Sequence, residues 1–331
     1  MQTLQYNAHA RAGLLGNPSD GYHGKTISVS VPAFAATVTL YEWETLEIIA
    51  SREDRSRFGS VLELAQDVEL HGYYGGIRLV KATIKKFVEF CNGKHTLHDR
   101  NFSIRYNSDI PRAVGLAGSS AIIVATLRAL MNFYEVGIPL EVQPSLVLSV
   151  EKDELSIQGG LQDRVIQVYD GLVYMDFSEQ ASTNQQGLCC GTYERLSTKN
   201  LPPLFLAYDA TVGEPTEVFH NRLRERFAQG ESKVVNAMTR FAEIAAEGRG
   251  VIQENNWARL NELIDENFDL RNSICQLPTA QVDMITRARK VGASAKFAGS
   301  GGAIIGIYQD DSMFDQLQLT LNQIGCDILK V

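Results

Sequence analysis

A glycine- and serine-rich loop lies at residues 115–120, directly before an apolar stretch at 121–134. Glycine and alanine let a backbone approach a ligand closely and adopt positive φ. Unpaired N–H groups and the dipole at a helix N-terminus favour a phosphate there. Ser119 and Ser120 are placed for an N-cap, and a hydroxyl there can bind Mg²⁺ that a nucleotide carries. The alternative is a capped, buried helix, but the clustering of small residues favours phosphate binding.

Gly24-Lys25-Thr26 is a second possible phosphate-binding sequence. A P-loop needs a glycine five residues before Gly24, where this chain has Ser19, and it needs a helix afterwards. Residues 26–31 instead alternate in polarity with the period of a strand. We therefore reject a P-loop at this position.

The segment 11–22 joins four kinds of polar group in a stretch that contains several glycines. Arg11 is a cation, Asn17 an amide, Asp20 a carboxylate and Tyr22 a phenol. Asn17 and Asp20 offer donors and acceptors for a polyhydroxylated ligand. The alternative is an Asx-type turn with no ligand.

Glu151 is followed by a glycine-containing turn that leads to Asp163 and Arg164. Phosphoryl transfer needs a metal anchor and a group that positions the acceptor hydroxyl. Two carboxylates could supply both, although Asp163 and Arg164 could equally cap a helix and pair at the surface. Further along, residues 299–302 (Gly-Ser-Gly-Gly) lie between two strand-like runs, and they predict either a tight hairpin or a second wall beside the phosphates.

The elements that must position these segments mix strand and helix patterns without regular alternation, which predicts an α+β fold. We expect strands at 26–31, 36–41, 46–49, 102–106, 172–177, 204–208, 295–297 and 303–308 and at the end of the chain, and helices at 75–91, 121–134, from Pro144, and at 215–229, 231–247, 255–273, 279–291 and 311–323. We expect one lobe at 1–178, a polar crossover at 179–199 and a second lobe at 200–331.

The composition is that of an ordinary globular protein, with 44% hydrophobic and 21% charged residues among 331. The net charge of −8 and the lack of a basic stripe argue against a nucleic-acid partner. No apolar run has the length of a membrane span, and the first residues lack a secretory signal. Five scattered cysteines predict free thiols in a reducing, cytoplasmic compartment.

In their order along the chain, these segments resemble the galactokinase–homoserine kinase–mevalonate kinase–phosphomevalonate kinase (GHMP) superfamily. The central signature of that family resembles residues 111–121, and its N- and C-terminal signatures resemble residues 11–20 and 296–302. The resemblance spans nearly the whole chain. It implies an α+β, two-lobed GHMP kinase fold, with an N-terminal lobe like ribosomal protein S5 domain 2 and a ferredoxin-like C-terminal lobe. ATP would lie between the lobes.

Within the superfamily, runs at 13–20, 72–78, 160–165 and 267–271 resemble the glucuronokinases. These enzymes transfer the γ-phosphate of ATP to the anomeric hydroxyl of D-glucuronate. The resemblance therefore implies a kinase that uses ATP and Mg²⁺ on a small sugar-acid substrate. Two alternatives stay open: a kinase for another sugar or a mevalonate-like acceptor, and a non-catalytic nucleotide-binding sensor on the same fold. The sequence indicates no oligomeric state.

The resemblance also implies roles for individual residues. Asp163 is expected to be the base or an orienting carboxylate, and Ser120 and Glu151 are expected to bind Mg²⁺. Arg11 replaces a lysine of related kinases; it keeps the charge but cannot act as a neutral proton shuttle. The nucleotide-binding candidates are Pro111, Gly115, Leu116, Ala117, Gly118, Ser119 and Ser120. The substrate-binding candidates are Asn17, Asp20, Tyr22, Gln162, Arg164 and Gly301, and Arg164, Arg271 and Arg78 could each bind a substrate carboxylate.

Overall fold

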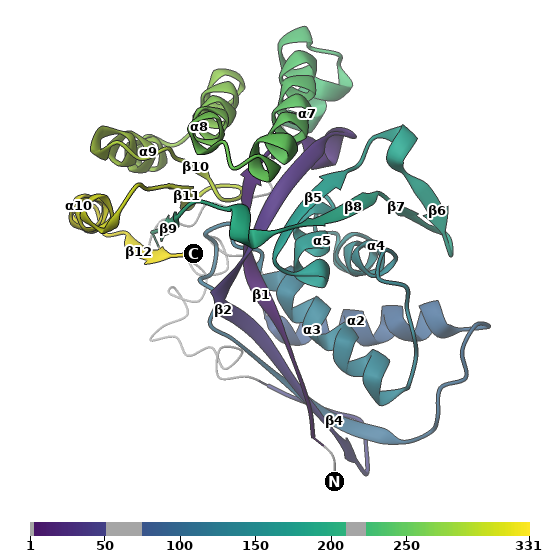
Figure 1. Ribbon diagram of the computed structural model, residues 1–331. Coiled ribbons are helices and arrows are strands. Elements are labelled where there is room, and N and C mark those ends of the chain that lie inside the picture. Colours follow the sequence, from purple (N-terminus) through teal and green to yellow (C-terminus); the bar gives the residue numbers. More distant parts are fainter. Residues whose placement is uncertain (1–2, 51–74, 210–222) are drawn as a thin grey trace, which may run out of the picture.

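The computed structural model describes residues 3–50, 75–209 and 223–331 (Figure 1). Two main β-sheets with helices packed against them account for most of these residues, which confirms the α+β prediction. Residues 72–74 of one family-like run and residues 215–222 of one predicted helix lie outside the described ranges.

The first sheet is built around the long strand β2 (Lys25–Trp43). Its strand order is β3-β4-β2-β5-β8, and β1 pairs with β2 along almost its whole length. The other strands are β1 (Thr3–Leu15), β3 (Glu47–Ile49), β4 (Asn101–Ser108), β5 (Leu172–Asp176) and β8 (Thr192–Leu196).

The prediction of two separate strands at 26–31 and 36–41 was wrong, because both belong to β2. The register with β1 jumps from Ala10–Val31 to His9–Ala35, so that residues 32–34 bulge out of the ladder. Pro32 has no N–H to donate, and a bulge is where a strand tolerates a proline. The bulge bends the chain without ending the strand.

No strand is predicted at 3–15, and residues 11–15 belong to the segment predicted as a turn at 11–22, so the structure corrects both predictions with β1. The strand is rich in alanine, which has little β-propensity, and tertiary burial against β2 decides its conformation. The turn itself begins after Leu15 and contains the 3₁₀ helix η1 (Ser19–Tyr22) and a cis peptide bond between Asn17 and Pro18.

The central helix of the first lobe is α3 (Gly118–Phe133), which packs against β1 and β2 on one side and α2 (Gly76–Cys91) on the other. Burial on both sides explains why this helix is apolar nearly all round. The chain then forms α4 (Gln143–Ser149), the π-helical turn η2 (Val150–Glu154) and α5 (Gln162–Tyr169). Figure 1 shows α2 to α5 gathered on one side of the sheet.

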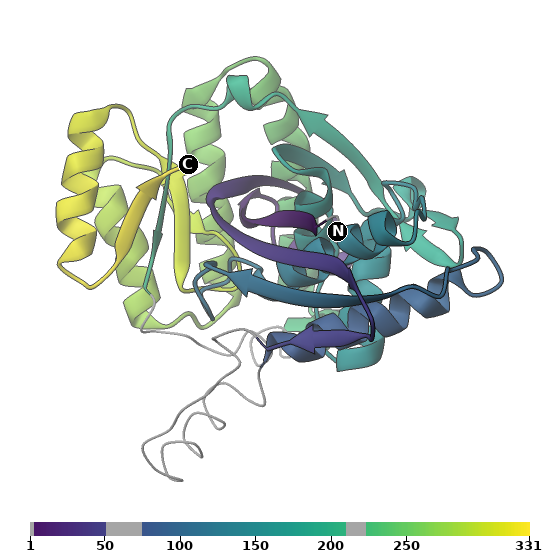
Figure 2. The same ribbon diagram turned by 90° about the horizontal axis from the view of Figure 1, so that it is seen from below.

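The second sheet is antiparallel with the order β10-β11-β9-β12. Among the described residues, several helices lie between the strands at 204–208 and 296–297, and one helix lies between the strands at 303–307 and 327–330. This βαββαβ chain order with this strand arrangement is ferredoxin-like, as expected. Figure 2 shows this sheet and its helices beside the first lobe. The elements are β9 (Leu204–Tyr208), α7 (Ser232–Gln253), α8 (Trp257–Ile274), α9 (Thr279–Val291), β10 (Lys296–Phe297), β11 (Ala303–Ile307), α10 (Asp311–Asn322) and β12 (Asp327–Lys330).

The segment predicted as a crossover contains regular structure. A small hairpin is formed by β6 (Thr183–Gln185) and β7 (Leu188–Cys190), and β8 then adds to the first sheet beside β5. Two short 3₁₀ helices flank these strands, η3 (Glu179–Ala181) and η4 (Thr198–Asn200). The lobe boundaries at 178 and 200 stay predictions.

The two halves of the chain meet where α7 packs on β2 and β1, and where α8 and β11 pack on β1. The loops that carry the predicted signatures lie at this junction. Within the described ranges, no helix is both long and apolar enough to cross a membrane.

Candidate active site

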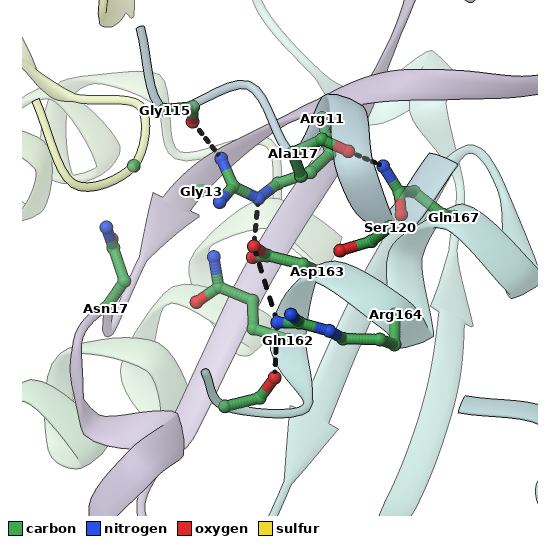
Figure 3. A network of polar contacts seen from close by, with 12 residues as sticks. Arg11, Gly13, Asn17, Gly115, Ala117, Ser120, Gln162, Asp163, Arg164 and Gln167 are labelled. Carbon is green, nitrogen blue, oxygen red and sulfur yellow. Dashed lines mark hydrogen bonds and ion pairs between the residues drawn. The ribbon is translucent and has the colours of Figure 1, made fainter. Parts of the chain in front are cut away.

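The predicted phosphate loop enters α3 through two left-handed residues. Gly115 has φ of +73°, and Ala117, at the N-cap, has φ of 62° and ψ of 41°. No side chain caps the helix, so the prediction of a serine N-cap was wrong, and Ser119 and Ser120 lie in the first turn. The side chain of Gln167 donates a hydrogen bond of 2.7 Å to the Ala117 carbonyl oxygen and holds this strained residue (Figure 3). The first N–H groups of α3 are thus left without a side-chain partner, as an anion site requires.

The second glycine loop packs directly on the first. A Cβ atom at Gly299 would collide with the Gly115 carbonyl oxygen, and one at Gly115 would lie 2.9 Å from the Gly301 carbonyl oxygen. The buried guanidinium of Arg271 donates hydrogen bonds of 2.7 Å to the carbonyl oxygens of Gly299 and Ser300. The segment 299–302 is therefore the connection between β10 and β11 and also lies against the predicted phosphate loop.

Ser120 and Glu151 come together from α3 and η2. The Ser120 hydroxyl donates to Glu151 Oε1 at 3.1 Å, and the Arg164 guanidinium pairs with Glu151 Oε2. All three side chains are buried, which excludes a surface role for Arg164. Burial raises the pKa of Glu151, and the charge of Arg164 opposes this shift. A π-helical turn such as η2 is frequent at functional sites.

The donor set at Ser120 and Glu151 fits a hard cation, because both groups offer oxygen. The described residues contain no cluster of three or more His, Cys, Asp or Glu side chains that could bind a metal. Mg²⁺ accepts a site with only two protein ligands, because water molecules and substrate phosphates usually supply its other ligands.

Arg11 and Asp163 form an ion pair between β1 and the first turn of α5. Arg11 Nε donates to Asp163 Oδ1 at 2.7 Å, and Arg11 Nη1 donates to the carbonyl oxygens of Gly115 at 2.6 Å and Ala298 at 3.2 Å (Figure 3). Arg164 Nη1 lies 3.6 Å from Asp163 Oδ2. Arg11 therefore connects the carboxylate to both glycine-containing loops.

Asp20 packs against the turn that precedes α5. Its Oδ2 atom accepts a hydrogen bond of 3.3 Å from the Gln162 N–H, and a Cβ atom at Gly160 would collide with it. Burial, and then the charge of Asp163, raise the pKa of Asp20 to about 6. The Gln162 side chain is 3% exposed, and its Oε1 atom has no hydrogen-bond partner among the described residues. An unmatched buried oxygen is expected where a ligand supplies the donor.

Asn17 and Leu116 each contact another residue of the site. The Asn17 side chain accepts a hydrogen bond from Lys296 Nζ. Leu116 packs into the core, and its carbonyl oxygen accepts from the Arg11 N–H. Tyr22 packs its ring on Phe227 with centroids 4.7 Å apart, and burial raises the pKa of Tyr22 to about 12. Pro111 lies part-exposed ahead of α3, and Arg78 lies part-buried on α2.

Lys296 is a site residue to which sequence reasoning gave no role. It is 1% exposed, and Nζ donates to Gly13 O at 2.6 Å, Asn17 Oδ1 at 2.6 Å and Phe297 O at 2.9 Å. Burial and the charges of Arg271 and Arg11 lower the pKa of Lys296 well below its ordinary value. The signal in the sequence is a lysine between apolar residues in a predicted strand. A lysine buried in such a strand needs hydrogen-bond partners, which indicates a structural or functional role.

Comparisons with known proteins agree with this geometry. Residues 78–171 match the family model of the GHMP kinases N terminal domain. The chain is 42% identical to probable glucuronokinase 2 of Arabidopsis thaliana, covering 91% of this chain and 83% of that protein. It is 41% identical to glucuronokinase 1 of the same plant, covering 91% of this chain and 84% of the relative.

A solved structure shares the fold at low sequence identity. The galactokinase of Lactococcus lactis complexed with galactose superposes with a TM-score of 0.78 at 13% identity, covering 99% of this chain and 93% of that one. This likeness confirms the expected two-lobed fold, and the plant relatives establish the family. The chain belongs to the GHMP kinase superfamily, and it is a kinase.

Proposed function

We propose that this kinase transfers the γ-phosphate of ATP to a sugar acid, and that D-glucuronate receives it at the anomeric hydroxyl. The observation that carries the proposal is the convergence of Ser120, Glu151, Asp163 and Arg11 beside the N-terminus of α3. The names of the two plant relatives support the choice of acceptor.

ATP phosphates would bind at the start of α3, between the two glycine-containing loops. The uncapped N–H groups of the first turn and the helix dipole provide the attraction. The glycines at 115, 299 and 301 keep side chains out of the space where the loops meet. Hydrogen bonds from Gln167 and Arg271 hold the loops in place before the nucleotide arrives, and such preorganisation reduces the free-energy cost of binding.

Ser120 and Glu151 would hold Mg²⁺. The ion supplies neutralisation of the negative charge on the transferred phosphoryl group. Arg164 fixes the Glu151 carboxylate through its paired guanidinium, so that the Oε1 edge faces Ser120. Each of the three guanidinium nitrogens of Arg164 contacts Glu151 or, at 2.8 Å, Gly160 O. We therefore assign Arg164 a positioning role and not the binding of a substrate carboxylate.

Asp163 would receive or orient the proton of the acceptor hydroxyl. Its neighbour Arg11 stays protonated at any physiological pH, so it cannot take the proton. Arg11 instead fixes the Asp163 carboxylate and adds positive charge beside the loops where phosphoryl charge develops. The acceptor itself would be bound by Asn17, Asp20 and Gln162, which lie on the Asp163 side of this cluster.

The test is a panel of acceptors assayed with ATP and Mg²⁺. D-glucuronate, D-galacturonate, D-glucose, D-galactose and mevalonate are compared by kcat/KM from ADP release, and the phosphorylated carbon is identified by NMR. We expect D-glucuronate to give the highest kcat/KM and a 1-phosphate product. A higher kcat/KM for a neutral sugar or mevalonate would contradict the acceptor assignment, and ATP binding without turnover on any acceptor would favour the sensor alternative.

A further inference from the structure

Lys296 connects the C-terminal lobe to the turn that follows β1. Its ammonium group reaches from β10 to Gly13 O at the end of β1 and to the Asn17 side chain in the turn. The third proton goes to Phe297 O in the lysine's own strand. All three donors of a lysine ammonium are thereby used, so this side chain has no donor left for a substrate.

The lysine determines which way the Asn17 amide points. The charged form of Lys296 can only donate, so in this form the atom of Asn17 that faces Nζ is the carbonyl oxygen. The Asn17 NH₂ group therefore points away from Lys296. Among the described residues it donates no hydrogen bond.

Asn17 and Gln162 flank Gly13. A Cβ atom at Gly13 would lie 2.8 Å from Gln162 Nε2 and 3.1 Å from Asn17 Cγ, so only glycine leaves room for both amides. Within the described part of the chain, Gln162 Oε1 accepts no hydrogen bond and Asn17 Nδ2 donates none. One amide with a free oxygen and one with a free NH₂ group thus lie beside the same glycine, and a polyhydroxylated substrate can satisfy both.

The backbone of the same turn is also held from the C-terminal lobe. Asn267 on α8 accepts a hydrogen bond of 2.6 Å from Gly16 N–H and donates one of 3.2 Å to Asn17 O. Asn267 thus fixes the chain at Asn17, while Lys296 fixes the side chain. Two buried C-terminal residues complete a turn of the N-terminal lobe.

We propose that Lys296 is a positioning residue for acceptor binding, because it orients Asn17 so that its NH₂ group donates to an oxygen of the sugar acid. The inference rests on the proposed function only for the identity of the acceptor. Lys296 itself would not touch the substrate, and its loss would alter acceptor binding more than ATP binding.

The experiment compares Lys296→Met with Lys290→Met in the full-length protein. Lys290 is an exposed lysine on α9 and provides the matched control. Loss of a charged hydrogen-bond partner that leaves a buried group unsatisfied weakens binding by roughly 10-fold to 100-fold. We expect Lys296→Met to raise the acceptor KM by at least about 10-fold while the ATP KM stays within about 2-fold, and Lys290→Met to change neither.

A double-mutant cycle with Asn17→Ala separates positioning from a general structural role. If Lys296 acts through Asn17, Lys296→Met should add less than about 2-fold to the acceptor KM once Asn17 is alanine. Additive effects in the cycle, or equal increases in both KM values, would overturn the proposal.

Asn17→Asp keeps the proposal testable if Lys296→Met does not fold. An aspartate keeps an oxygen for Lys296, which also balances its charge, but it removes the NH₂ donor. We expect a folded protein with a raised acceptor KM, and an unchanged acceptor KM would overturn the assignment. The acceptor panel described under the proposed function is assayed first with the unmodified protein. If D-glucuronate is not the acceptor, the panel shows it, and the KM values of the variants are then compared with the acceptor that is turned over.

Discussion

The two sides of the candidate site are built in different ways. The side assigned to ATP consists of two loops, at 115–118 and 299–302, that meet through glycines and present backbone groups. The side assigned to the acceptor consists of buried side chains from four separate segments, among them Asn17, Gln162 and Lys296. Backbone recognition needs small residues at fixed spacing, whereas side-chain recognition needs a network that only the folded chain assembles.

This difference predicts that variants of the two sides affect different kinetic constants. Substitutions between the two sides, at residues that would act on the reacting groups themselves, should lower kcat. Residues of the loops should raise the KM for ATP, and residues of the acceptor side should raise the KM for the acceptor or change its pH dependence.

The largest effect is expected on kcat, from a substitution at Asp163 between the two sides. Asp163→Asn removes the carboxylate that would accept or orient the hydroxyl proton, and positioned acid–base groups contribute about 10²-fold to 10⁴-fold. We expect kcat to fall by roughly 10³-fold with nearly unchanged ATP binding, measured by ADP release and by nucleotide titration. A kcat within about 10-fold of the unmodified protein would remove Asp163 from the assigned role.

Glu151→Gln should give the next largest effect. The substitution keeps the shape but weakens the assigned metal ligand and leaves the buried Arg164 without its carboxylate partner. We expect the Mg²⁺ concentration for half-maximal activity to rise about 10-fold or more. Glu154→Gln, in the same helical turn but paired with the exposed Lys85, is the matched control. Equal Mg²⁺ dependence in the two variants would contradict the assignment.

Gly115→Ala tests the loop side. The left-handed φ of Gly115 and the 2.9 Å approach to Gly301 O strain any side chain there, by about 1–2 kcal/mol for the backbone alone. We expect a lower free energy of unfolding and an ATP KM raised by about 10-fold, since the loop must shift. Gly250→Ala lies in α7 with open space around it and should stabilise the helix by about 0.5–1 kcal/mol without changing either KM. An unchanged ATP KM in Gly115→Ala would argue against the loop as the phosphate site.

The smallest effect is a pH dependence on the acceptor side. The pKa of Asp20 is raised from 3.8 to about 6, so its carboxylate forms only above that pH in the folded protein. A carboxylate accepts hydrogen bonds from sugar hydroxyls better than a neutral acid does. We expect kcat/KM for the acceptor to rise with pH through an inflection near 6, and Asp20→Asn to remove that inflection. An identical profile in both proteins would show that Asp20 does not control acceptor binding.

The same shift has a consequence for stability. The folded protein binds a proton at Asp20 between pH 3.8 and about 6, where the unfolded chain does not. The contribution of Asp20 to the free energy of unfolding is therefore present below pH 3.8 and is lost as the pH rises through 6. Chemical denaturation of the unmodified protein and of Asp20→Asn, repeated between pH 3.8 and about 6, measures this contribution to the free energy of unfolding.

The sequence predicted the loop at 115–118 and the helix that follows it, because their signal is local. Glycines and serines ahead of an all-apolar helix indicate both the loop and the buried α3. The ferredoxin-like order of the second sheet followed from the family resemblance, and the structure reproduces it.

The sequence could not predict the acceptor side in the same way. The contact of Lys296 with Asn17 joins positions 279 residues apart, and the role of Gln167 depends on a contact with Ala117. The alanine-rich β1 and the bulge at Pro32 were also missed, since tertiary pairing with β2 overrides local propensity. Arg164 is a candidate for a substrate carboxylate by its charge, which the sequence shows, whereas its pairing with Glu151 is visible only in the structure.

The most direct test of the division into two sides is a pair of variants measured with both substrates. Steady-state kinetics of Gly115→Ala and Asn17→Asp, each with ATP and the acceptor varied in turn, give four KM values. We predict that Gly115→Ala raises only the ATP KM and that Asn17→Asp raises only the acceptor KM. If either variant raises both constants equally, the loops and the side-chain network do not act as separate binding sites.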